Sequence, residues 1–504
     1  MRRVGERRPD LRRPGVVVFT SHLLSAFTGL LFTLMVTREL GTEFGVWQNI
    51  GDLVFYFTAL ENIVPFWAKR FVARGFEGSG RTGLACSLAL GTSIAAIYGL
   101  AVPYLMALMG VGGSFWLPYA LVAIQIFEIY VLRGLGATLH PRRPEAVGYA
   151  IMVKEFTKLA AAFFLVLQYG LGLLGAVCSV LLAHAAQVGF SFLMAKPFLT
   201  GRFNSAYAKE WLKGSFVPIY SFVGRRMYTI VLFILFATAG EVARGYYGAA
   251  QVIGMMIFNT SFLAYALYPR LLSESGGSSS SSPASRDIET ALKLVLMFSI
   301  PMTVGAIVLS DLLLAVLNVA FKPAWPVLIV LAPYYALQSL STVFWSVVVG
   351  SERVDAQARI PVRRLVRTRL FALYTVPYIC NSAMIPLALW LIPAAPDALE
   401  ASLRTAFLFV AYSIALTGAT YSLARRSMSF SFPLGSTAKY ALAAAAMAIP
   451  LVLLPHEPLR IYWALTLVAI GTSIYVGVLL ALDEETRGLL RELLRALSTR
   501  NRPR

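Results

Sequence analysis

Long apolar blocks constrain this chain more than any other feature of its sequence. Each block has about 20 to 27 residues, which is enough for a helix to cross a hydrocarbon core of roughly 30 Å. Because 58% of the 504 residues are hydrophobic and 14% are charged, an ordinary soluble protein is excluded. The fourteen spans that we predict cover residues 15–37, 42–66, 82–107, 114–137, 147–168, 171–195, 214–238, 244–268, 288–315, 325–350, 370–393, 402–424, 436–455 and 460–482. The sequence therefore predicts an all-α polytopic membrane protein.

Basic residues are distributed very unevenly between the two sides that fourteen spans define. Most of the 44 Lys and Arg residues lie in the two termini and in every second connection. The remaining connections hold few basic residues, namely Arg38, Arg244, Lys322, Arg404 and Arg460. The positive-inside rule then places both termini in the cytoplasm of a cell whose cytoplasmic membrane holds the protein. The net charge of +19 faces anionic membrane lipids, so nucleic acid is not needed as a partner.

Three charged residues lie deep within the fourth and fifth predicted spans. Lys154 and Lys158 are one helical turn apart on one face of the fifth span, and Glu128 on the fourth span lies at a similar depth. An unpaired charge at this depth is costly, so we predict an intramembrane ion pair of Glu128 with Lys154 or Lys158. Whether this pair only locks two helices or belongs to a polar site is left open.

Two arginines lie in the seventh predicted span, about eleven residues after its start at Gly214. If Arg225 and Arg226 face a cavity, their guanidinium groups suit the phosphate oxygens of an anionic substrate. If the span begins later, near Val223, both arginines lie at the inner membrane interface instead. The sequence leaves both interpretations open.

Amides, a histidine and a carboxylate lie within the first, second and eighth predicted spans. These candidate cavity residues are His22, Gln48, Asn49, Asp52, Gln251 and Asn259. A single Asn or Gln in a span is more often an interhelical hydrogen bond than a ligand contact. The sequence contains no P-loop, no paired-His motif and no Cys cluster, so we expect no cofactor and no metal.

Several segments between residues 15 and 355 resemble one family of membrane transporters. They are LMVTRELGTEFGVWQ (34–48), GYYGAAQVIG (245–254), LYPRLL (267–272), SIPMTVGAIVLSDLLLAVL (299–317) and FKPAWPVLIVLAPYYALQSLSTVFWSVVVGSERVD (321–355). The pattern of Gly, Pro and aromatic positions resembles the Wzx-type polysaccharide-biosynthesis flippases. These flippases belong to the multidrug/oligosaccharidyl-lipid/polysaccharide (MOP, MATE-like) exporter superfamily. The last four spans match only in number and hydropathy.

The resemblance implies a particular division of the chain. Two six-helix lobes, 15–195 and 214–424, form a V around a central cavity and are joined by a cytoplasmic linker at 196–213. Two further helices follow at 436–482. The cytoplasmic tails are a basic segment at 1–14 and a basic amphipathic segment at 483–504. Spans one, two, seven and eight line the cavity in this family, which implies the cavity residues named above together with Arg225 and Arg226.

The resemblance also implies a function without chemical catalysis. A flippase moves a polyprenyl-(di)phosphate-linked oligosaccharide across the cytoplasmic membrane by alternating access, for synthesis of a cell-surface polysaccharide or glycoprotein. H⁺ or Na⁺ is a candidate coupling ion. The alternative within the superfamily is a MATE-type drug/cation antiporter that uses Asp52 or Glu128. A membrane glycosyltransferase or polymerase, an enzyme, needs larger outer loops with grouped acidic residues, and a scaffold protein needs fewer buried polar residues.

Overall fold

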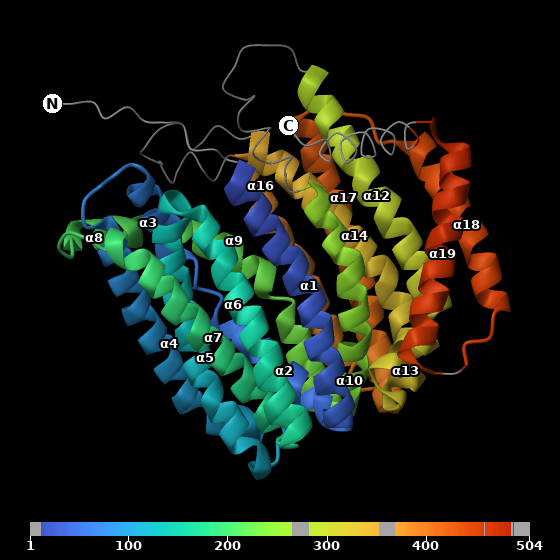
Figure 1. The fold of residues 1–504 in the computed structure, drawn as a ribbon, viewed down its shortest axis with the longest axis horizontal. Helices are drawn as coiled ribbons and strands as arrows, with labels where there is room; N and C mark the ends of the chain where they lie inside the picture. The colour runs from blue at the N-terminus through green and yellow to red at the C-terminus, as the bar shows by residue number, and fades with distance from the viewer. Residues whose placement is uncertain (1–11, 265–281, 352–367, 458, 485–486, 488–504) are drawn as a thin grey trace, which may run out of the picture. The chain divides into compact units, whose positions relative to one another are not determined.

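The computed structural model describes residues 12–264, 282–351, 368–457, 459–484 and 487. Every regular element in these residues is a helix, as the sequence predicts (Figure 1). Most of both predicted tails, 1–14 and 483–504, lies outside the described residues, so the amphipathic character of the second tail stays a prediction.

The chain folds as two compact units, Met1–Gly245 and Tyr246–Arg504. The predicted linker at 196–213 lies inside the first unit, because the chain that follows it packs against the helices that precede it. The division into two six-helix lobes at this linker stays a prediction.

The first unit is a helical bundle in which helices pack against both consecutive and more distant helices of the chain. Its elements are α1 (Arg12–Leu40), η1 (Gly41–Glu43), α2 (Phe44–Phe57), α3 (Ile63–Ala73), α4 (Ser79–Leu108), η2 (Gly113–Phe115), α5 (Trp116–Arg142), α6 (Pro144–Ala162), the π-helical turn η3 (Phe163–Gln168), α7 (Gly172–Ala195), η4 (Lys196–Phe198), α8 (Ser205–Gly214), α9 (Phe216–Arg226) and the first part of α10 (Thr229–Phe258). Helix α5 packs against α4 and α7, and α6 packs against α1 and α7 (Figure 1).

The second unit continues from α10. Its elements are η5 (Asn259–Ala264), α12 (Ser282–Val308), α13 (Ser310–Leu317), η6 (Val319–Ala324), α14 (Trp325–Ser351), α16 (Arg369–Leu391), α17 (Ala398–Ser427), α18 (Leu434–Leu453) and α19 (Ile461–Leu482). Helix α14 packs against α12 and α17, and the last two helices pack against each other. A buried apolar cluster that includes Ile288, Phe344 and Leu373 joins α12, α14 and α16.

Ten helical segments of the described residues are long and apolar enough to cross a membrane, which supports a multi-pass membrane protein. The predicted spans 15–37, 42–66 and 147–168 are not among the ten, and 214–238 and 244–268 fall within one continuous segment, Ile219–Ala264. The predicted number of fourteen is therefore not confirmed.

One of these differences arises from a break that an apolar pattern does not reveal. The predicted span 42–66 is interrupted at residues 58–62, where α2 has ended and α3 has not begun. Within the continuous segment, Gly240 has φ 80° and ψ −175°, a conformation open to glycine, and divides α10 into two helical parts. This glycine lies at the polar turn that the sequence predicts between the seventh and eighth spans.

Candidate functional site

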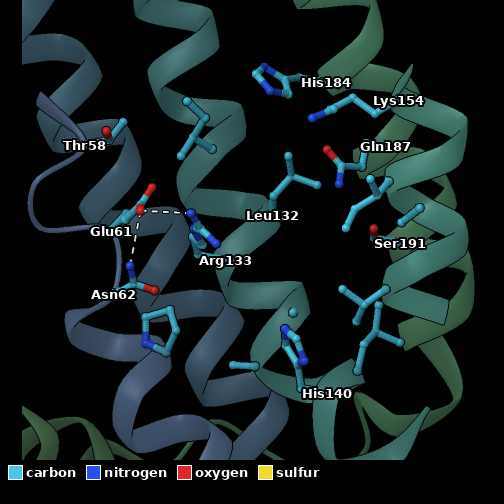
Figure 2. A pocket seen from close by; sticks show the side chains of 18 of the residues that line it. Thr58, Glu61, Asn62, Leu132, Arg133, His140, Lys154, His184, Gln187 and Ser191 are labelled. Carbon is cyan, nitrogen blue, oxygen red and sulfur yellow. Dashed lines mark hydrogen bonds and ion pairs between the residues drawn. The ribbon is translucent and has the colours of Figure 1, made fainter. Parts of the chain in front are cut away.

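A polar pocket of about 560 Å³ lies inside the first unit, beside the break between α2 and α3. Its walls come from α2, the break, α3, α5, α6, α7 and the end of α9. Figure 2 shows Glu61 from the break facing Arg133 from α5, with Gln187 and Ser191 of α7 on the opposite wall. Non-helical backbone within a membrane protein is tolerated where it lines a cavity, and residues of this break line the pocket.

Arg226 holds the broken end of α2. Its guanidinium donates to the carbonyl oxygen of Phe55 and, at 2.9 Å, to Thr58 Oγ1, and it lies 4.0 Å from the centre of the Phe55 ring. A helix that stops inside the bundle leaves carbonyl groups without intrahelical partners, and Arg226 satisfies one of them. The arginine is thereby fixed in one orientation with its side chain along the pocket wall.

Glu61 is the meeting point of three hydrogen-bond donors. Its Oε1 atom accepts from Arg133 Nη2 at 3.0 Å, from Asn62 Nδ2 at 3.1 Å and from Arg226 Nη2 at 3.4 Å. The Glu61 side chain is 5% exposed, whereas that of Arg133 is 52% exposed. A desolvated carboxylate is stable only when it is paired, and two arginines from different helices provide the pairing.

The charge of the pocket is predominantly positive. Its lining includes Lys69, Arg133, Lys154 and Arg226, whereas Glu61 is the one carboxylate among the lining residues. Burial, and then the positive charge of Arg133, lower the pKa of Lys69, which lies beyond the predicted end of the second span. The basic groups therefore repel one another, and an additional anion would stabilise them.

Lys154 is neutralised from outside the pocket by a carboxylate that the sequence analysis did not select. Glu155 is fully buried and contacts Lys154 Nζ at 2.8 Å and Lys158 Nζ at 2.5 Å. The hydroxyls of Ser25 and Thr28 donate to the same carboxylate at 2.8 and 2.7 Å, so it joins α1 to α6. The structure thus pairs both lysines with Glu155 rather than with Glu128, because their sequence neighbour reaches them from the same helix.

Glu128 faces a histidine instead of the predicted lysines. Its Oε2 atom lies 4.0 Å from His184 Nδ1 on α7, which is longer than a hydrogen bond. Both atoms are buried and have no hydrogen-bond partner among the described residues. His184 lines the pocket and Glu128 lies just behind it.

Asp52 is held by an ion pair and is not among the residues that line the pocket. Arg244, which is 1% exposed, donates from Nε to Asp52 Oδ2 at 2.7 Å and from Nη2 to Asp52 Oδ1 at 2.9 Å. Its Nη2 group also lies 3.4 Å from Gln48 Oε1. Two of the predicted cavity residues thus join α2 to the part of α10 that follows Gly240.

Of the other predicted site residues, Asn49 and Arg225 belong to the first unit but are not among the residues that line the pocket. Asn49 is buried and accepts a 2.6 Å hydrogen bond from the Tyr119 hydroxyl. Arg225 is exposed and lies over the Phe222 ring, so Arg226 alone of the two arginines lines the pocket. Gln251 and Asn259 belong to the second unit, and the side chain of His22 lies outside the described residues.

Several pocket residues, Glu61 and Arg133 among them, are not candidate site residues in the sequence analysis. Lys69, His140 and His184 were not selected at all. A weak signal existed, because Thr58, Glu61, Asn62 and Pro65 come together within one predicted span. Polar residues and a proline at this density disfavour a continuous membrane helix.

No protein-family model matches the sequence, and no curated protein matches it. Solved structures do share its fold, and two of them are described as transporters of the MOP superfamily. The lipid II flippase MurJ in an inward closed conformation aligns over 95% of this chain and 99% of its own, with a TM-score of 0.64 and 14% identity.

Two further solved structures have the same arrangement of helices. An inward-facing multidrug-resistance MATE family transporter of the MOP superfamily covers 82% of this chain and 97% of its own, with a TM-score of 0.57 and 14% identity. A MOP superfamily transporter from Pyrococcus furiosus covers 82% and 95%, with a TM-score of 0.51 and 15% identity. The chain therefore shares the fold of these transporters, as the resemblance implies; at these identities the likeness concerns the fold alone.

Proposed function

We propose that this protein is a transporter that moves a polyprenyl-(di)phosphate-linked oligosaccharide across the cytoplasmic membrane by alternating access. The observation that carries the proposal is the basic pocket at the break between α2 and α3. Arg133 and Arg226 share Glu61 as their carboxylate, and the pocket lining also includes Lys69 and Lys154, the latter paired with Glu155. Arginine forms bidentate contacts with phosphate oxygens, so such a pocket suits a phosphorylated headgroup.

The fold supports the same proposal. The aligned proteins include a lipid II flippase and MATE transporters, so the fold accommodates both a lipid-linked and a drug substrate. Transport by alternating access needs two packings of similar energy that expose a site to either side. We infer that the lipid tail stays in the bilayer while the headgroup alone enters the polar interior. In this proposal the termini are cytoplasmic and the protein carries out no chemical reaction.

The test is translocation of a fluorescent polyprenyl-diphosphate sugar in proteoliposomes. Arg226→Gln and Arg133→Gln each remove a charge-assisted contact worth about 1.5–3 kcal/mol, so we expect flipping at limiting substrate to fall by about 10- to 100-fold. Arg404→Gln is the matched control, because Arg404 pairs with Glu400 on α17 and is not among the residues that line the pocket. Imposed H⁺ and Na⁺ gradients in the same vesicles test for a coupling ion.

A drug/cation antiporter is the second candidate, and one observation favours it. Glu128 has a buried oxygen without a hydrogen-bond partner among the described residues. A carboxylate that binds a proton or a cationic drug needs such an oxygen. Asp52 is a weaker candidate because Arg244 already occupies both of its oxygens. Drug–cation exchange that is lost in Glu128→Gln, in a protein that never flips the lipid, would replace the flippase proposal.

A further inference from the structure

Glu61 occupies the place that a phosphate group needs. Its Oε1 atom takes one donor from Arg133 and one from Arg226, the two guanidinium groups that face the pocket from α5 and α9. A phosphate oxygen accepts from the same N–H groups with the same geometry as a carboxylate oxygen. A ligand phosphate therefore cannot make its best contacts while Glu61 remains in position.

We propose that Glu61 is an internal counterion which a phosphate group of the ligand displaces, so that the pocket binds phosphate by exchange. The inference rests on the proposed function for the identity of the ligand. It adds that Glu61 pairs with the two arginines in the absence of ligand and gives up this position when a ligand phosphate binds. The ligand group is a multiply charged phosphate or diphosphate, which neutralises Arg133 and Arg226 more fully than one carboxylate does.

The surrounding contacts allow this exchange without loss of the site. Arg226 remains anchored to the carbonyl of Phe55 and to Thr58 Oγ1 when Glu61 leaves, so its free Nη2 group stays directed into the pocket. Arg133 is half exposed and can follow the ligand, and Asn62 is adjacent to Glu61 in the chain. An exchange of partners at arginines that stay in place requires little reorganisation of the pocket wall.

Displacement also has a mechanical consequence. Glu61 lies in the break at residues 58–62, and its contacts tie the break to α5 through Arg133 and to α9 through Arg226. A ligand that takes both arginines removes both contacts of Glu61 at once, and Thr58 Oγ1 then remains the contact of the break with Arg226. Because a ligand shifts a conformational equilibrium only through differential contacts, loss of the ties couples binding to movement of the broken helix.

The experiment is calorimetric titration of the purified full chain in nanodiscs with inorganic pyrophosphate. Glu61→Gln keeps the size of the side chain and removes the competing charge, so we expect pyrophosphate to bind at least about tenfold more tightly. Arg133→Gln is expected to weaken binding, and the double variant to lose most of the gain. Glu400→Gln makes the same change in net charge at a partly exposed pair that does not line the pocket, and it is expected to bind like wild type.

Equal or weaker binding by folded Glu61→Gln overturns the inference, as does an equal gain in Glu400→Gln. If Glu61→Gln does not fold, Glu61→Asp keeps the charge with a shorter reach, and the inference then requires binding tighter than that of wild type.

The same titration with polyprenyl diphosphate in the nanodisc distinguishes the source of the phosphate. If polyprenyl diphosphate displaces pyrophosphate, the phosphate comes from a lipid headgroup. If it does not, while Glu61→Gln still binds pyrophosphate more tightly, exchange with free phosphate is upheld and the lipid-linked substrate is refuted. Flipping by wild type without a gain in Glu61→Gln refutes exchange alone.

Discussion

The buried ion pair of Asp52 and Arg244 offers the sharpest test of the structure. Arg244 is 1% exposed and donates to both carboxylate oxygens at 2.7 and 2.9 Å. For charge centres roughly 4 Å apart, an effective dielectric constant of 20 gives an attraction of about 4 kcal/mol. Removal of one partner from a buried pair typically costs about 3–5 kcal/mol, since the other charge is left desolvated and unpaired.

We therefore expect Asp52→Asn to destabilise the protein by about 3 kcal/mol or more. Across a unit of this size, a loss of about 3 kcal/mol lowers Tm by roughly 6–12 °C. Thermal unfolding of the detergent-purified protein measures this shift for Asp52→Asn, Arg244→Gln and the double variant. If the two groups pair, the double variant is less destabilised than the sum of the single variants, by about 0.5–3 kcal/mol.

The control for this cycle is the partly exposed pair of Glu400 and Arg404, one turn apart on α17 at 3.0 Å. Such pairs contribute about 0.3–0.5 kcal/mol, so Glu400→Gln is expected to leave Tm almost unchanged. Additive effects of Asp52→Asn and Arg244→Gln, or single losses as small as that of Glu400→Gln, would refute the buried pairing.

Three further substitutions test the packing of the first unit by the same thermal unfolding measurement. Glu155→Gln leaves two lysines without their shared carboxylate and is expected to cost about 3–5 kcal/mol; an unchanged Tm would contradict the buried network. Gly45→Ala places a Cβ atom 1.8 Å from the carbonyl oxygen of Glu241 and is expected to cost about 1–3 kcal/mol or more, whereas Gly99→Ala meets nothing within 4 Å and serves as its control. Gly240→Ala imposes an unfavourable φ of 80° and is expected to cost about 1–3 kcal/mol; if it proves neutral, the division of α10 at this residue is wrong.

The candidate site was only partly predictable from the sequence. Arg226 was selected because a guanidinium inside an apolar block needs a polar environment, and this reasoning depends on composition alone. Asp52 was selected for the same reason, but its partner Arg244 lies 192 residues away. Glu128 was assigned to lysines at a similar depth, whereas Glu155 reaches them from the same helix. Depth in a membrane limits which charges can meet, but it does not select among them.

The sequence by itself determined the helical class and the multi-pass character of this protein, because lengths of apolar chain and the cost of unpaired backbone groups in lipid leave few alternatives. Only the tertiary structure decided that the second predicted span breaks at residues 58–62 and that Glu61 there meets Arg133 and Arg226. The physical reason is that burial in lipid is a local property of each segment. The pairing of buried charges instead depends on which helices become neighbours when the bundle packs.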